Sequence, residues 1–307
     1  MERTNVVLTG ASGLLGRSIY QKLTESPSSD WEVQGWAFNR LHDGKFVKVD
    51  LLNTAEVTGA IEKAKPHIII HAAAERKPDV VAQKMDMSFD LNVNSTMELA
   101  KAADKLKALL IYVSTDYVFD GARPPYKEQD RPNPLNAYGE MKLRGEMAVQ
   151  GNCRDYAILR VPILYGPVER LGEGAVDVIL KNMIEAKPSG TPLDMSNHER
   201  RCPTHVEDVA SAVCLLADLW RKDKFAVHGI YHWRGDEEMT KYDMAVIMAN
   251  KFGLPASQLR AVGESAGAGA ASRPYNAWLA NQRLVELGLT NQHSFATSIS
   301  CLQPFIG

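Results

Sequence analysis

The sequence predicts an α/β protein, with a doubly wound parallel sheet followed by a smaller lobe. From Asn5 to about Tyr165, short β-branched runs alternate with segments of helical period. Apolar runs bounded by helices are typical of strands covered on both faces, in a parallel sheet with right-handed crossovers. After Gly166 the alternation loosens, and Gly and Pro become more frequent. The expected division is a nucleotide-binding (Rossmann) domain over 1–165, to which 203–235 returns, and a smaller C-terminal substrate-type lobe over 166–202 and 236–307.

The elements follow in order along the chain. Six apolar runs are predicted strands of the large domain: 6–9, 32–37, 46–49, 68–71, 109–114 and 156–160. Residues 206–219 have one apolar and one polar face at helical spacing, which predicts a helix. Residues 229–233 are a further strand candidate, and the Gly-, Ala- and Ser-rich stretch 264–272 predicts a loop.

Composition excludes several classes of protein. The 307 residues include 35 Lys plus Arg and 37 Asp plus Glu, so the net charge is −2 and there is no basic footprint for nucleic acid. The longest apolar runs fall far short of the roughly 20 residues that a membrane helix needs. Glu2 and Arg3 lead directly into a strand pattern, with no secretion signal. The four cysteines are scattered without C-x-x-C spacing, so we expect reduced thiols, no metal site and a cytoplasmic protein.

A glycine-rich turn follows the first strand. Its sequence is Gly10-Ala11-Ser12-Gly13-Leu14-Leu15-Gly16, and a helical stretch starts directly after it. Glycines at such a turn let backbone N–H groups approach a pyrophosphate, whose charge then lies at the helix N-terminus. We therefore expect a dinucleotide site, and the alternative is a purely structural turn.

The end of the second strand bears on the choice of cofactor. A carboxylate there would bind the ribose 2′-hydroxyl of NAD, but this strand ends in Phe38-Asn39-Arg40. A guanidinium can instead pair with a 2′-phosphate, which favours NADP over NAD. The alternative is that Arg40 is an ordinary solvated surface arginine.

A reactive constellation follows the fifth strand. Tyr138 and Lys142 are four residues apart, hence on one face of a helix, where an ammonium would lower the pKa of the phenol. Thr115, at the strand end, adds a hydroxyl; in isolation it would be taken for a capping residue. His71, at another strand end, is either a proton carrier or, as we favour, a buried histidine with satisfied hydrogen bonds.

These motifs together resemble the extended short-chain dehydrogenase/reductase family. The resemblance implies a catalytic triad of Thr115, Tyr138 and Lys142. It also implies cofactor contacts at Gly10, Ser12, Gly13, Leu14, Leu15, Gly16, Phe38, Asn39, Arg40, Asp50, Leu51, Ala72, Arg76, Tyr138, Lys142 and Leu164. Asp50-Leu51 matches the adenine-contacting pair of the family, although Asp50 alone would pass for a helix N-cap.

Longer stretches identify the branch. Residues 114–121 and 134–139 resemble the dTDP-4-dehydrorhamnose reductases, which use NADPH to reduce the C4 ketone of a nucleotide-linked deoxysugar. Residues 73–81, 162–165 with 168–169, 201–206, 231–233 and 239–242 are more similar to the regulatory β subunits of methionine adenosyltransferase. Asn39 departs from that pattern, which has a second arginine there.

The second resemblance implies a non-catalytic subunit. It would bind NADP(H), associate with the catalytic α subunits and modulate S-adenosylmethionine synthesis; the alternative is an active NADPH-dependent 4-keto sugar nucleotide reductase. The subunits of that family are thought to use their C-terminal tail as an anchor. Here the tail ends in Pro304-Phe305-Ile306-Gly307, which suits an apolar groove on a partner or, alternatively, packing against its own domain.

Overall fold

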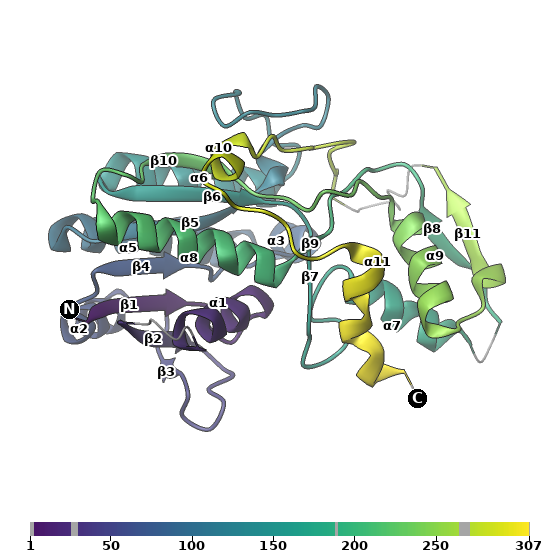
Figure 1. Cartoon of the computed structure of the whole chain (residues 1–307), viewed down its shortest axis with the longest axis horizontal. Coiled ribbons are helices and arrows are strands. Elements are labelled where there is room, and N and C mark those ends of the chain that lie inside the picture. Colours follow the sequence, from purple (N-terminus) through teal and green to yellow (C-terminus); the bar gives the residue numbers. More distant parts are fainter. Residues whose placement is uncertain (1–2, 26–29, 188–189, 264–270, 307) are drawn as a thin grey trace.

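A seven-stranded parallel sheet organises the larger part of the chain (Figure 1). The computed structural model describes residues 3–25, 30–187, 190–263 and 271–306. The strand order is β3-β2-β1-β4-β5-β6-β10, and every neighbouring pair is parallel. The strands are β1 (Thr4–Thr9), β2 (Trp31–Ala37), β3 (Val47–Lys48), β4 (Ile68–His71), β5 (Leu109–Thr115), β6 (Tyr156–Val161) and β10 (Gly229–His232).

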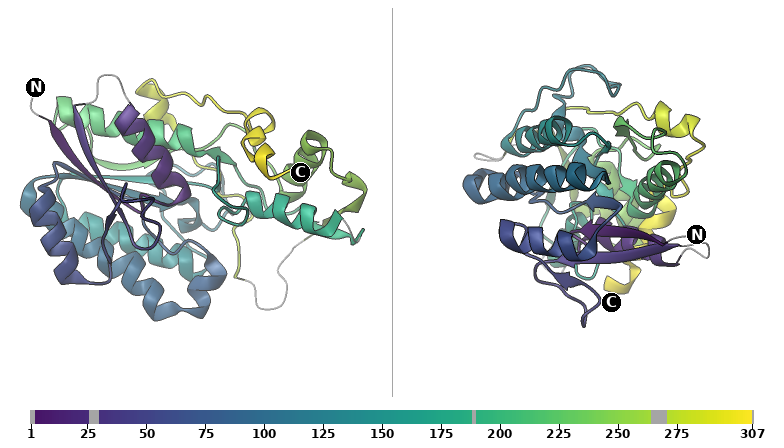
Figure 2. Two further views of the ribbon diagram at one scale, coloured as in Figure 1. Left: turned by 90° about the horizontal axis from the view of Figure 1, so that it is seen from below. Right: turned by 90° about the vertical axis from the view of Figure 1, so that its left-hand side faces the viewer.

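Helices cover both faces of this sheet, as the two views in Figure 2 show. The described α-helices are α1 (Leu14–Glu25), α2 (Thr54–Ala64), α3 (Pro78–Gln83), α4 (Met85–Phe89), α5 (Ser95–Leu106), α6 (Ala137–Asn152), α7 (Asp177–Ala186), α8 (Val206–Lys222), α9 (Lys241–Phe252), α10 (Gln282–Glu286) and α11 (Phe295–Ser298). Short π- or 3-10-helical segments are η1 (Asp90–Asn94), η2 (Asp116–Val118), η4 (Ala256–Gln258) and η5 (Ile299–Phe305).

The side chains of each strand point alternately to the two faces of the sheet, and each face packs against its own set of helices. In β1, Val6 and Leu8 belong to the core shared with α1 and α8, whereas Val7 belongs to the core shared with α2, α5 and α6. Successive side chains of a strand point to opposite faces, so the apolar run Val6-Val7-Leu8 serves two cores. This is the doubly wound arrangement that the sequence predicts, with the predicted strands and the 206–219 helix confirmed to within a few residues.

The smaller lobe lies at the carboxyl end of the sheet, on the right in Figure 1. It contains α7, α9, α11, η5 and a two-stranded parallel sheet of β8 (Leu193–Ser196) and β11 (Leu259–Val262). A second short pair, β7 (Leu164–Tyr165) with β9 (Thr204–His205), lies where the chain passes between the lobes.

Residues 277–289 pack against the large domain, although the expected division places them in the smaller lobe. Leu284 and Leu289 pack into the core of the large sheet, and Leu279 packs with Phe119 and Tyr126. The last third of the chain therefore crosses back over the large domain before it ends in the smaller lobe. Of the loop expected at 264–272, residues 264–270 lie outside the described part. No helix among the described residues is both long and apolar enough to cross a membrane.

Candidate functional site

The glycine turn between β1 and α1 has the geometry of a phosphate cradle. Gly10 has a φ of +69°, and a Cβ there would lie 2.8 Å from the backbone nitrogen of Ala73, so only glycine fits without strain. The N–H of Gly13 donates to the Gly10 carbonyl at 2.9 Å, and α1 begins at the next residue. The turn thus leads directly into the N-terminus of α1, a geometry that fits a dinucleotide pyrophosphate.

The other predicted cofactor residues lie after the ends of neighbouring parallel strands. Phe38, Asn39 and Arg40 follow β2, Asp50 and Leu51 follow β3, Ala72 and Arg76 follow β4, and Leu164 begins β7. Ligands of open α/β sheets bind at this edge. The N-cap interpretation of Asp50 is wrong: the cap of α2 is Asn53, whose Oδ1 accepts from the N–H of Glu56, while Asp50 accepts from Leu52.

Arg40 pairs with two carboxylates that no sequence motif indicates. Its Nη1 lies 2.7 Å from Glu169 Oε2 and 2.7 Å from Glu173 Oε1. Arg17, one turn into α1, donates to both oxygens of Glu173, at 2.7 and 2.9 Å. These partners are about 130 to 155 positions apart, and no local pattern links them.

Thr115, Tyr138 and Lys142 come from the end of β5 and the first turns of α6. The expected lowering of the Tyr138 pKa is wrong for this structure: burial raises that pKa well above its usual value, although a hydrogen bond with the Thr115 side chain acts to lower it. Lys142 Nζ donates to the carbonyl of Val113 at 2.7 Å and lies 4.0 Å from the centre of the Tyr112 ring. Burial lowers the pKa of Lys142 to about 7, with Glu146 opposing the shift.

His71 is a satisfied buried histidine. Its Nδ1 lies 2.7 Å from Thr9 Oγ1 and its Nε2 lies 3.0 Å from Thr96 Oγ1. Burial, with a smaller effect from Lys142, lowers its pKa to about 3, so the ring is neutral at physiological pH. This confirms the interpretation that we favoured over a proton carrier.

Three further groups, His205, Glu207 and His293, come together at the start of α8 with ligand atoms within 4.8 Å of one another. The two imidazoles stack, with centroids 4.0 Å apart and planes inclined by 14°. The lone pairs of an imidazole lie in its ring plane, so those of two stacked rings lie in separate, nearly parallel planes and do not converge on one cation. His205 Nδ1 also accepts from the N–H of Glu207. The arrangement therefore suits a helix cap better than a metal centre.

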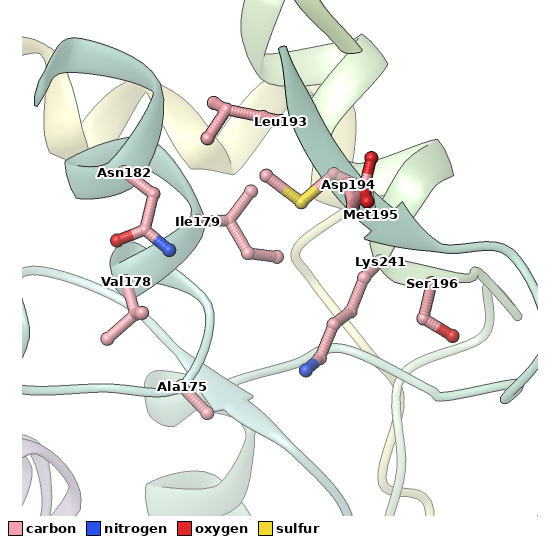
Figure 3. A pocket seen from close by; sticks show the side chains of 9 residues that line it. All are labelled: Ala175, Val178, Ile179, Asn182, Leu193, Asp194, Met195, Ser196 and Lys241. Atoms are coloured by element: carbon pink, nitrogen blue, oxygen red, sulfur yellow. The ribbon is translucent and has the colours of Figure 1, made fainter. Parts of the chain in front are cut away.

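A cavity of about 250 Å³ lies in the smaller lobe, between α7, β8 and the start of α9. Figure 3 shows the Lys241 side chain extending across it, with Ile179 and Met195 among the apolar residues of its wall. Burial lowers the pKa of Lys241, and nearby Arg273 acts in the same direction. None of its lining residues is a predicted cofactor residue, so the cavity is separate from the glycine turn.

Comparison with known proteins places this geometry in a family. The model of the RmlD substrate binding domain family matches residues 4–303. The chain belongs to the RmlD family. The methionine adenosyltransferase 2 subunit beta of Bos taurus is 44% identical over 302 residues, which cover 98% of this chain and 88% of that relative. The match confirms the resemblance stated from the motifs.

The reductase branch of the RmlD family is also represented. The dTDP-4-dehydrorhamnose reductase of Salmonella typhimurium is 30% identical over 285 residues, 91% of this chain and 90% of that enzyme. The crystal structure of the dTDP-4-dehydrorhamnose reductase from Bacillus anthracis in complex with NADP has a TM-score of 0.78 and 26% identity. It covers 99% of both chains. The fold of the RmlD family thus extends over the whole of this chain, smaller lobe included.

Proposed function

We propose that this protein is an NADP(H)-binding, non-catalytic regulatory subunit of methionine adenosyltransferase. It associates with the catalytic α subunits and modulates S-adenosylmethionine synthesis. The observation that carries the proposal is the 44% identity to a methionine adenosyltransferase β subunit along 98% of the chain. Four cysteines without disulfide bonds suit a reducing compartment, so the proposal includes a cytoplasmic location.

The cofactor part of the proposal is supported by the glycine cradle and by Arg40. Gly10, Gly13 and the start of α1 would hold the pyrophosphate, and Arg40 would bind the 2′-phosphate. When bound, the nicotinamide supplies hydride-transfer chemistry; in a regulatory subunit the dinucleotide acts as a ligand that stabilises the fold by mass action.

Titration with NADPH and NADH tests this part. The wild-type protein is expected to bind NADPH more tightly, and Arg40→Ala to lose about tenfold in NADPH affinity, the size of one charged hydrogen bond. Lys48→Ala is a control, since this exposed lysine lies on the neighbouring edge strand. Absence of binding to either dinucleotide by the wild-type protein would contradict the proposal.

The partner part concerns the end of the chain. Ile299 and Leu302 are buried in the core of the smaller lobe, whereas Pro304 is exposed and Phe305 half-buried. The start of the tail therefore packs against its own domain, which is one of the two possibilities that the sequence left open. Pro304 and Phe305 are the accessible part of the tail, and we propose that they anchor the partner. Removal of the whole tail would expose the core, so a point substitution is the cleaner probe.

Co-purification with the catalytic subunit tests the partner part. We expect association at micromolar concentrations, weakened by Phe305→Asp and unchanged by Phe225→Asp. Phe225 is the matched control because its side chain is 93% exposed and lies in the loop between α8 and β10 of the large domain. If the full-length wild-type protein shows no association, the regulatory proposal is wrong; if both variants bind alike, only the anchor is wrong.

A second candidate function is an active NADPH-dependent 4-keto sugar nucleotide reductase. It is favoured by Thr115, Tyr138 and Lys142, which all lie at the carboxyl end of β5 and the start of α6. In that case a 4-keto-deoxysugar nucleotide would oxidise NADPH, and Tyr138→Phe would abolish the reaction. No oxidation across a panel of such sugars would exclude it.

A further inference from the structure

A short acidic segment between β7 and α7 lies against the predicted cofactor residues. Glu169 and Glu173 belong to this segment and pair with Arg17 and Arg40, which flank the glycine turn. Glu169 Oε1 also lies 3.1 Å from Nε2 of His42. Arg40, which we expect at the 2′-phosphate, and Arg17, which directly follows the glycine turn, are thus already bound to carboxylates of the same chain.

The segment is held in this position from both sides. Asp177, in the first turn of α7, accepts from the N–H groups of Gly172 and Gly174 at 2.5 Å each. Arg76, itself a predicted cofactor residue, donates to the carbonyl of Glu173. The Glu173 side chain is only 6% exposed. Burial acts to raise its pKa, but the hydrogen bonds from Arg17 and Arg40 hold it at about 2, so the carboxylate stays charged.

We propose that Glu169 and Glu173 form an acidic latch that competes with the phosphate groups of the cofactor for Arg17 and Arg40. The inference rests on the proposed binding of NADP(H). Carboxylates and phosphates accept hydrogen bonds from the same guanidinium donors. The donors already engaged, both Nη groups of Arg17 and Nη1 of Arg40, therefore serve a carboxylate or a phosphate, but not both at once. The latch lowers the affinity for the dinucleotide, and Glu169 in particular reduces the preference for a 2′-phosphate.

Glu173 and Glu169 are expected to affect cofactor binding differently. Glu173 contacts both arginines and is nearly buried, so it opposes binding of any phosphate beside the turn. Glu169 is 33% exposed and contacts Arg40 at 2.7 Å, with a longer distance of 3.5 Å to Arg17. A dianionic 2′-phosphate on Arg40 would lie beside the Glu169 carboxylate, and like charges at this range repel.

Glu169→Gln is the decisive variant, because it removes the charge and keeps the shape. We expect its dissociation constant for NADPH to fall about fivefold, the upper range for one partly exposed ion pair, and its constant for NADH to change less than twofold. Glu169→Asp keeps the charge and should retain the wild-type ratio of the two constants. Glu185→Gln, on the exposed surface of α7, is the control for a general loss of negative charge.

The ratio of the NADPH and NADH constants separates the latch from a merely structural role. The latch is wrong if Glu169→Gln binds NADPH no more tightly than the wild type does. It is also wrong if the affinities for NADPH and NADH rise by the same factor. In both cases the proposed binding of NADP(H) stands. If neither the wild type nor Glu169→Gln binds either dinucleotide, the proposed function fails as well. Binding of NADPH by Glu169→Gln but not by the wild type would support the latch and contradict the proposed binding of NADP(H) by the wild-type protein.

Discussion

A buried ion pair beneath the candidate site offers the sharpest test of the energetic reasoning. Glu146, on α6, accepts from Arg160 Nε at 2.9 Å and from Arg160 Nη2 at 2.6 Å. It also accepts from Ser114 Oγ at 2.5 Å, and both charged side chains are 2% exposed. Glu146→Ala would leave the Arg160 guanidinium buried without its counter-charge, at a cost of about 3–5 kcal/mol of unfolding free energy.

The same helix supplies the control. Glu140 pairs with Arg144 at 2.8 Å, but both side chains are about half exposed. Such an i,i+4 pair contributes roughly 0.3–0.5 kcal/mol, so Glu140→Ala should be nearly neutral. Replacement of both Glu146 and Arg160 by Met removes the charges together and should recover at least half of the loss, because the main cost is the unpaired charge and not the absence of the pair.

Urea unfolding followed by tryptophan fluorescence measures these differences. Three of the five tryptophans, Trp36, Trp220 and Trp233, are fully buried and become exposed to water on unfolding. The reasoning would be refuted if Glu146→Ala and Glu140→Ala had similar effects. It would also be refuted if the double Met variant were less stable than Glu146→Ala alone.

Two other predictions concern Lys142 and the glycine turn. Burial lowers the Lys142 pKa from 10.5 to about 7, so between these values the unfolded chain binds more protons than the native one. Unfolding free energy should therefore rise from pH 7 to 9 more steeply in the wild type than in Lys142→Met, and parallel pH profiles would contradict this. Gly10→Ala should cost about 1–3 kcal/mol in thermal unfolding, through its positive φ and the close approach of Ala73. Gly59→Ala is its counterpart: with open space around it on α2, it should gain up to about 1 kcal/mol.

Much of the fold was predictable because its signals are local. Ile68-Ile69-Ile70 is apolar at every position, and in the structure all three residues are fully buried between two helical layers. The glycine turn was predictable for the same reason: one strand, one turn and one helix follow one another within 25 residues. Strand ends then bring residues such as Arg40 and Arg76 to a common edge, as the topology requires.

What the sequence did not indicate depends on contacts between distant segments. Glu169 and Glu173 lie in an irregular stretch with no periodicity, and only the tertiary fold brings them to Arg17 and Arg40. The pKa of Tyr138 was mispredicted for a related reason. The four-residue spacing places Lys142 on the same helix face, but the ammonium turns to the carbonyl of Val113, and burial then dominates the phenol.

The electrostatics of the site bear on which proposed function is stronger. A general acid works best when its pKa is near the working pH. Burial instead raises the pKa of the Tyr138 phenol, which moves it away from neutrality. Binding of a dinucleotide makes no such demand on Tyr138, since the cradle at Gly10 and the guanidinium at Arg40 act without proton transfer. The features that serve binding are therefore better developed in this structure than those that serve catalysis, which favours the regulatory subunit over the reductase.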